Sequence, residues 1–279
     1  SAACGGEGRE GVTSLSAIYG LAGELEESVV VGRVRAVNIG HPRWEELLEP
    51  FCLPGSCRVN LLALGDVGST LAMGLRLLGG HTILDIGLCD LRENVPERWE
   101  FELGQIGIPG PGVKVVRPEE LFDCDVFLFC ASRFVPDTAV KSGDVRMAQY
   151  EANRPLVEHY ARLARETEFR GLFCVVSDPV DPLCRAALLA SNRDEDGGLD
   201  GRGLSVNQVR GFGLGVMHAR AAYYARKDPR FADFLTEGRT FGPHGEGLVV
   251  ANSIGNHHDE LSRELTEKAK RANLDMRTL

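Results

Sequence analysis

Several features are missing from this sequence, and each absence excludes a class of protein. No apolar run approaches the length that crosses a membrane, and no basic-then-apolar signal pattern opens the chain. Positive charge does not prevail, because the formal net charge is −9, which argues against a nucleic acid or an anionic membrane as partner. No repeat or low-complexity tract stands out. We therefore expect a globular protein that binds neither membranes nor nucleic acids.

Cysteine pairs with metal-binding spacing are also missing. The chain has eight cysteines but no CxxC pair, and only Cys52 and Cys57 lie close together. Cys89, Cys130 and Cys174 lie inside apolar, strand-like runs, where cysteine acts as a small hydrophobic residue. This placement favours neither disulfides nor a metal site and indicates a reducing, cytoplasmic setting.

What the sequence does contain is clearest between residues 58 and 90. An apolar run of strand length, VNLLAL, is followed by the tight turn GDVG. Residues 69–78 then carry leucines at helical spacing, and a pair of glycines ends that segment. A second apolar run, 83–89, ends in Asp90. This order of strand, glycine turn, helix, strand and acid predicts the start of a dinucleotide-binding unit.

The residue types in this stretch suit a dinucleotide. Glycines let the backbone approach a pyrophosphate, whose charge is favoured by N–H groups and by the helix dipole. The cofactor-binding residues expected in the turn are Gly65, Asp66, Val67 and Gly68. Asp90 can accept hydrogen bonds from the adenosine ribose and would repel a 2′-phosphate, which favours NAD over NADP. In the usual dinucleotide-binding pattern G-x-G-x-x-G, the first glycine is replaced here by Ala63. This replacement costs little conformational energy if Ala63 keeps an extended conformation. The alternative is an ordinary βαβ unit with a glycine turn.

Further along the chain, apolar runs and helical patterns alternate. Strands are expected at 113–116, 126–131 and 171–176, one helical turn at 118–122, and helices at 144–167 and 183–190. The segment after Asp90 is polar, and Pro155 predicts a kink or a restart in the longer helix. Continuous apolar strands are typical of a parallel sheet covered on both faces. The predicted fold class is therefore α/β, with a doubly wound parallel sheet.

The two ends of the chain give weaker patterns. A polar, glycine-rich loop at 191–203 marks a boundary or an insertion. Beyond it we expect a helix at 218–225, a strand-like run within 240–254 and a charged amphipathic helix at 259–272. Before the nucleotide unit, 14–27 and 44–48 are predicted as helices and 29–39 as a strand. We find no chemistry in residues 1–57.

Five segments occur in an order that resembles the lactate/malate dehydrogenase family. ALGDVGST is similar to the family's nucleotide loop, DVFLFCASR resembles its fourth strand and the start of its substrate-covering loop, and VVSDPVDPL resembles the family's VSNPVDIL. VRGFGLGVMHAR is similar to its IGSGxxLDSAR segment, and FGPHGEG to its IGEHGDS. The matches run from residue 58 to about residue 250. Residues 1–57 lie outside the resemblance.

The resemblance implies a Rossmann domain joined to a substrate domain. We expect an N-terminal extension at 1–57, a dinucleotide-binding Rossmann domain at 58–190, and a smaller α+β substrate domain at 191–279 that is partial relative to the family. It also implies NAD as cofactor, a small carboxylate as substrate, and a homodimer or homotetramer. Ala131 and Ser177, in the second and third matching segments, are expected beside the cofactor.

The resemblance further assigns roles to three side chains. His244 matches the histidine that exchanges a proton with the substrate while hydride moves to or from the nicotinamide, although a histidine between glycines also suits a plain turn. Arg220 matches the arginine that holds the substrate carboxylate with a bidentate fork; the alternative is a salt bridge on a helix surface. Arg146 matches the loop arginine that polarises the substrate carbonyl, or is an ordinary solvated arginine.

Two departures bear on the chemistry. The family aspartate that orients the histidine aligns with Met217, and a methionine cannot accept that hydrogen bond. The motif asparagine near nicotinamide and substrate is replaced by Asp178, which would repel a carboxylate or could itself serve as the missing acid. Glu246 is a second candidate for that acid, and we prefer Asp178. The run His257-His258-Asp259 does not predict a metal site, because adjacent histidines point in different directions.

Three functions remain open from the sequence. The first is a cytoplasmic NAD-dependent dehydrogenase of a small 2-hydroxy or 2-oxo acid, in which the loop after Arg133 closes over the site and excludes water. The second is a catalytically degenerate protein that binds or senses NAD. The third is a reductase for a substrate bearing a cation that Asp178 could pair.

Overall fold

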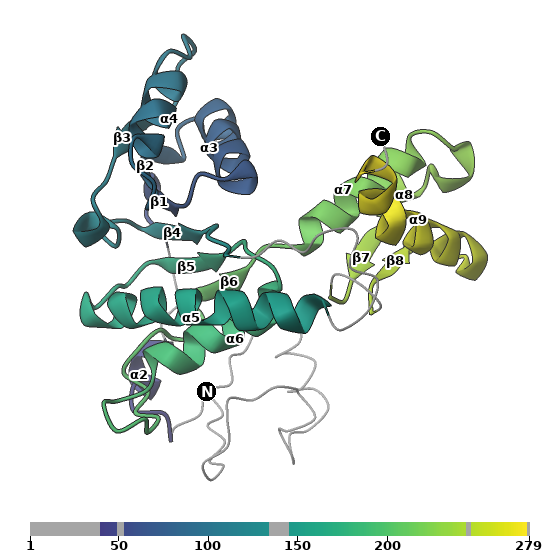
Figure 1. The fold of residues 1–279 in the computed structure, drawn as a ribbon. Coiled ribbons are helices and arrows are strands. Elements are labelled where there is room, and N and C mark those ends of the chain that lie inside the picture. The colour runs from purple at the N-terminus through teal and green to yellow at the C-terminus, as the bar shows by residue number, and fades with distance from the viewer. Residues whose placement is uncertain (1–39, 49–52, 134–144, 244–246, 278–279) are drawn as a thin grey trace. The chain divides into compact units, whose positions relative to one another are not determined.

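The computed structural model describes residues 40–48, 53–133, 145–243 and 247–277 (Figure 1). The chain forms two compact units that divide between Arg210 and Gly211. The helix and strand expected at 14–27 and 29–39 lie outside the described residues, whereas the short helix expected at 44–48 is present as α2 (Trp44–Leu48).

A six-stranded sheet forms the centre of the first unit. The order across the sheet is β3-β2-β1-β4-β5-β6, so the chain starts in the middle and extends to both sides. The pairs β1–β2, β2–β3, β1–β4 and β4–β5 are parallel. The strands are β1 (Cys57–Leu62), β2 (Ile83–Cys89), β3 (Gly112–Val115), β4 (Val126–Phe129), β5 (Leu172–Val175) and β6 (Val209–Gly211). The prediction of an α/β fold with a doubly wound parallel sheet is confirmed.

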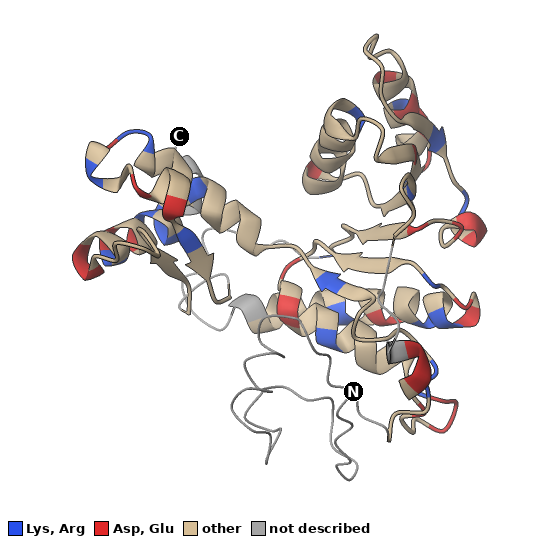
Figure 2. Ribbon diagram, turned by 180° about the vertical axis from the view of Figure 1, so that it is seen from behind, with Lys and Arg blue, Asp and Glu red and all other residues tan. Residues whose placement is uncertain are grey.

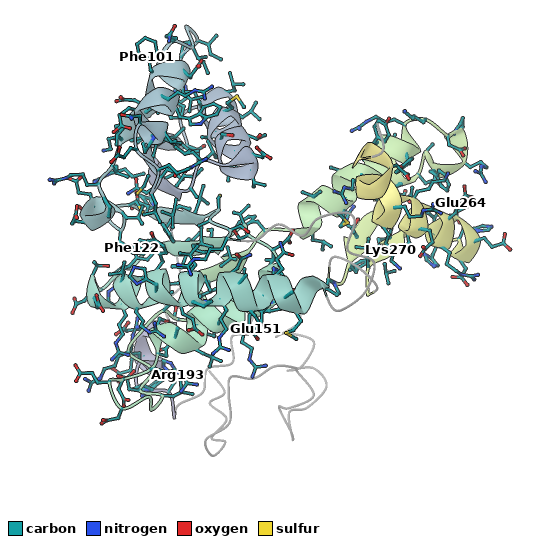
Figure 3. The ribbon with its side chains drawn as sticks, in the orientation of Figure 1. Phe101, Phe122, Glu151, Arg193, Glu264 and Lys270 are labelled. Atoms are coloured by element: carbon teal, nitrogen blue, oxygen red, sulfur yellow. The ribbon has the colours of Figure 1, made fainter. Side chains whose placement is uncertain are left out.

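Helices cover both faces of this sheet because its strand residues alternate between two cores (Figure 1). Phe127 and Phe129 pack with α5 (Val145–Glu166) and α6 (Val180–Ser191) on one face. Leu128 packs on the other face, with α3 (Asp66–Leu78) and α4 (Val95–Gly104). The first face is the aromatic one. Phe122, labelled in Figure 3, has its ring centroid 4.8 Å from that of Phe127.

Two helices depart from the sequence expectations. The polar segment after Asp90 forms α4, of which only Pro96 and Leu103 are buried, so its apolar pattern is too sparse to read. Pro96 lies at the start of this helix, where its missing N–H costs nothing. The long helix α5 runs through Pro155 without ending. The free energy gained by burying the apolar face of α5 in the core is larger than the cost of the one backbone hydrogen bond that proline removes. The turn expected at 118–122 is a short 3₁₀ helix, η2 (Pro118–Glu120).

The second unit is a helical layer on a small hairpin. Its helices are α7 (Leu214–Ala225), η3 (Pro229–Phe231), α8 (Phe234–Glu237) and α9 (Asp259–Arg277). Strands β7 (Arg239–Phe241) and β8 (Val249–Ala251) pair antiparallel within the stretch expected to hold one strand-like run. Met217, Ala221, Val250 and Leu265 are fully buried in its core.

The glycine-rich segment after α6 is tied to the first unit. Arg165 on α5 donates two hydrogen bonds to the Asp200 carboxylate, at 2.8 and 2.6 Å. The Gln208 side chain donates to the carbonyls of Phe169 and Gly171. The division between the two compact units falls after Arg210. The boundary between a Rossmann domain and a substrate domain, which the sequence placed at residue 191, stays a prediction.

Charged residues of both signs are interspersed on the helices of each unit (Figure 2). On α5, for example, Glu158 pairs with Arg154 and Arg162. Among the helices that the structure describes, none is both long enough and apolar enough to cross a membrane.

The turn between β1 and α3 brings two backbone segments into close contact. Ala63 has φ +74°, in the left-handed region, so the extended conformation that would make an alanine inexpensive here is not adopted. A side chain on an L-residue costs about 1–2 kcal/mol in that region. A Cβ added to Gly68 would fall well inside contact distance of the Ala63 carbonyl oxygen. Gly68 is thus required by the packing of α3 on the end of β1.

This contact predicts opposite effects for two glycine-to-alanine changes in α3. Gly68→Ala should lower the free energy of unfolding by about 2 kcal/mol or more, because the backbone must shift to admit the methyl group. Gly74→Ala, where a Cβ meets nothing within 4 Å, should raise it by up to about 1 kcal/mol through helix propensity. Urea unfolding of both variants measures this difference. Equal effects at the two positions would contradict the close contact.

The Arg165–Asp200 pair predicts a pH dependence of stability. Hydrogen bonds from Arg165 lower the pKa of Asp200 to about 2. Because the folded pKa lies below the unfolded value of about 3.9, the pair stabilises the fold above about pH 4 and loses this effect as the pH falls toward about 2. Asp200→Asn should therefore cost about 1–2 kcal/mol at pH 7 and much less near about pH 2.5. Asp196→Asn, at an exposed acid of the same loop, is the control and should cost little at either pH.

Candidate functional site

The candidate site begins where β1 ends at the carboxyl edge of the sheet. Gly65 is the N-cap residue of α3, and it has no side chain to cap the helix. The first N–H groups of a helix have no intrahelical acceptor, and the helix dipole makes this end attractive to an anion. A Cβ added to Gly65 would meet nothing within 4 Å, so the turn is open on this side. Asp66 and Val67 are exposed beside it, whereas Gly68 is buried.

Asp90 lies at the neighbouring strand end and is fully engaged by hydrogen bonds. Its Oδ2 accepts from the backbone N–H of Leu64 at 2.7 Å and from Nη2 of Arg92 at 3.0 Å. Its Oδ1 accepts from the backbone N–H and from Nε of Arg92, at 2.9 and 3.0 Å. Burial disfavours the charged form, but the hydrogen bonds from Arg92 and Leu64 outweigh it and hold the pKa of the Asp90 carboxyl below its usual range. Asp90 is therefore ionised at neutral pH.

The ends of β4 and β5 are joined through one buried asparagine. Asn153 on α5 has no exposed surface. Its Oδ1 accepts from the backbone N–H of Arg133 at 2.8 Å, and its Nδ2 donates to the carbonyl oxygen of Asp178 at 2.9 Å. Ser177 Oγ donates to the carbonyl oxygen of Ala131 at 2.6 Å. The predicted residues Ala131, Ser177 and Asp178 thus lie together at this edge.

Asn153 is a residue whose role the sequence did not reveal. A buried polar side chain in the middle of a helix needs hydrogen-bond partners, but nothing in the sequence says where those partners lie. Asp178, by contrast, is exposed. Its backbone is held by Asn153, while its side chain remains accessible to solvent.

The residues with predicted roles in proton transfer and substrate binding are described only in part. His244 and Glu246 lie outside the described residues. Arg146 lies in the first turn of α5, and its side chain is outside the described part of the structure. Met217 is fully buried in the core of the second unit, and Nη1 of Arg220 lies 4.0 Å from its sulfur. The roles of His244, Arg220 and Arg146 remain predictions.

Metal ligation and thiol chemistry find little support in the described residues. Within 40–48, 53–133, 145–243 and 247–277, no group of three or more His, Cys, Asp or Glu side chains could hold a metal ion. His257 Nε2 instead pairs with Asp259 Oδ1 at 2.9 Å, at the start of α9. Burial raises the pKa of Cys89 to about 11 and that of Cys130 to about 12, so both thiols stay protonated.

The known proteins that are similar to this chain in sequence include L-lactate dehydrogenases. No family model matches the chain. The L-lactate dehydrogenase of Mesomycoplasma hyopneumoniae is 26% identical over 201 residues, which are 70% of this chain and 58% of that protein. The L-lactate dehydrogenase of Treponema denticola is 28% identical over 200 residues, or 71% of this chain and 58% of that protein. The matched region thus spans less than two thirds of these relatives.

Solved structures show the same fold. The minor L-lactate dehydrogenase of Enterococcus mundtii, in its ligands-bound form, aligns with a TM-score of 0.61 at 22% identity, over 80% of this chain and 71% of that one. A malate dehydrogenase of Archaeoglobus fulgidus in complex with NADH aligns with a TM-score of 0.56 at 16% identity, over 78% and 69% of the two chains. Together with the motifs along residues 58–250, these relatives support membership of the lactate/malate dehydrogenase family, at low sequence identity.

Proposed function

We propose that this protein is an NAD-dependent oxidoreductase that acts on a small 2-hydroxy or 2-oxo acid. The observation that carries the proposal is the open Gly65 turn at the N-terminus of α3, with an ionised Asp90 at the adjacent strand end. In an open α/β sheet, ligands bind outside the carboxyl ends of the strands. The relatives named L-lactate dehydrogenase and the NADH-bound malate dehydrogenase support the same activity.

The nucleotide part of the proposal uses residues of the first unit. The N–H groups of the turn Gly65–Gly68 would hold the diphosphate, because they have no intrahelical acceptors and Gly65 leaves room for close approach. Asp90 faces the adenosine ribose in this arrangement, and Ala131 and Ser177 border the nicotinamide half. When bound, NADH supplies the hydride.

The substrate part rests on residues that the resemblance assigns. Arg220 would hold the substrate carboxylate, Arg146 would polarise its carbonyl, and His244 would give a proton to the carbonyl oxygen or take one from the alcohol. Met217 cannot support His244, because it is an apolar residue in the core of the second unit. We propose Asp178 as the acid that does so, since it is an exposed carboxylate beside the cofactor-binding edge.

A second candidate function is a protein that binds NAD without catalysing hydride transfer. The full burial of Met217 favours it, because the position of the family's orienting acid is here part of an apolar core. Nucleotide binding together with the absence of NADH oxidation across a panel of 2-oxo acids would support this candidate and reject the dehydrogenase.

The Gly65 turn yields a binding prediction that is independent of catalysis. Gly65→Asn should leave the melting temperature unchanged or slightly raised, because asparagine is a good N-cap residue. The same side chain would compete for the N–H groups and fill the open space, so NADH should bind about tenfold more weakly or worse. Gly55→Asn, in another turn where a Cβ meets nothing within 4 Å, is the matched control. Unchanged affinity in Gly65→Asn would place the diphosphate elsewhere.

Catalysis is tested at His244 and Asp178. With the best 2-oxo acid of the panel, His244→Ala should lower kcat by about a hundredfold or more while NADH binding persists. Asp178→Asn should lower kcat by about tenfold or more and shift the pH profile of kcat/KM, because the histidine loses its acidic partner. Stopped-flow and steady-state assays measure both. Intact turnover in Asp178→Asn would reject the role of that carboxylate.

A further inference from the structure

The carboxylate of Asp90 has no free acceptor capacity in this structure. A carboxylate offers about four lone-pair directions, and Asp90 accepts four hydrogen bonds, one from Leu64 and three from Arg92. Its side chain is only 5% exposed. Ribose hydroxyls that donate to this carboxylate would have to displace hydrogen bonds that the chain itself already makes.

Arg92 also changes the charge that a nucleotide would meet. Its guanidinium donates hydrogen bonds to both carboxylate oxygens of Asp90, through Nε and Nη2. An arginine side chain stays positively charged throughout the physiological pH range. The negative charge of Asp90 is therefore neutralised within hydrogen-bond distance. The Arg92 side chain is 62% exposed, so the solvent-facing member of the pair is the cation.

Arg92 keeps donors available for a ligand. A guanidinium has five N–H donors, and Asp90 uses only Nε and one hydrogen of Nη2. Among the residues that the structure describes, Nη1 of Arg92 has no hydrogen-bond partner. The geometry of a guanidinium fork suits a phosphate, and an arginine near the ribose is a recognised means of accommodating a 2′-phosphate.

We infer that Arg92 sets the nucleotide preference of this protein, and that the Asp90–Arg92 pair lets the adenosine-ribose site accept NADP(H) as well as NAD(H). This inference rests on the proposed function, because it places the adenosine ribose beside Asp90. Repulsion of a 2′-phosphate, as expected from Asp90 alone, requires an unpaired carboxylate. Here the phosphate gains a charged partner, whereas the ribose diol of NAD must compete with Arg92 for Asp90.

The test measures dissociation constants of NADH and NADPH for the 279-residue chain by nucleotide fluorescence. In the wild type the two constants should agree within about tenfold. In Arg92→Ala, NADPH should bind about tenfold more weakly or worse, because a charged hydrogen-bonded partner is lost, and NADH should bind more tightly. Arg92→Gln, which keeps a polar side chain without the charge, should shift the ratio in the same direction.

Arg162→Ala is the matched control, since it removes an exposed arginine from an ion pair with Glu158 on α5 and leaves Asp90 untouched. It should leave the ratio of the two constants unchanged. Circular dichroism confirms folding of each variant. A wild-type preference for NADH of about a hundredfold or more, or an unchanged ratio in both Arg92 variants, would overturn the inference while the proposed function stands. Failure of the wild type to bind either nucleotide would overturn both.

Discussion

The contact between Gly68 and the Ala63 carbonyl is the constraint on which the nucleotide edge depends. With no side chain at Gly68, the first turn of α3 can lie directly against the end of β1. At the end of β1, Ala63 adopts a left-handed backbone conformation, in which an alanine is strained. The following residue, Leu64, donates its N–H to Asp90 at the end of β2. The turn after β1 is thus in contact both with the first turn of α3, at Gly68, and with Asp90 at the end of β2.

The two faces of the sheet give this edge a rigid support. Along β4, successive residues enter different cores, so that each strand is held from both sides. One face is built on the phenylalanines around Phe122, and the other on smaller aliphatic residues. A site placed at the ends of such strands inherits their fixed positions, whereas a site on loops alone would not.

Much of the first unit could be predicted from the sequence because its signals are local. A buried parallel strand is an uninterrupted apolar run, and the turn after β1 contains the glycines of a dinucleotide-binding loop. The helix α4 could not be predicted, since its sparse apolar residues become meaningful only against the sheet. The left-handed conformation of Ala63 could not be predicted for a similar reason. Its carbonyl lies close to Gly68, five residues further along the chain, and the sequence does not show that approach.

Pairings between side chains were harder to foresee than the fold. Asp90 was correctly located at a strand end, but its neutralisation by Arg92 depends on one choice of side-chain rotamer. The bridging role of Asn153 depends on two loops that are far from it in the sequence. A sequence reveals which residues reach the carboxyl edge; it does not reveal which of them already bind one another there.

Asn153 has a mechanical consequence for this edge. The same amide side chain holds the backbone at Arg133 and at Asp178, and it is anchored in a helix that spans the face of the sheet. A displacement of either strand end must therefore pull on the other or break a buried hydrogen bond, which costs about 1–3 kcal/mol. The segments that follow β4 and β5 are therefore mechanically coupled through the single carboxamide group of Asn153.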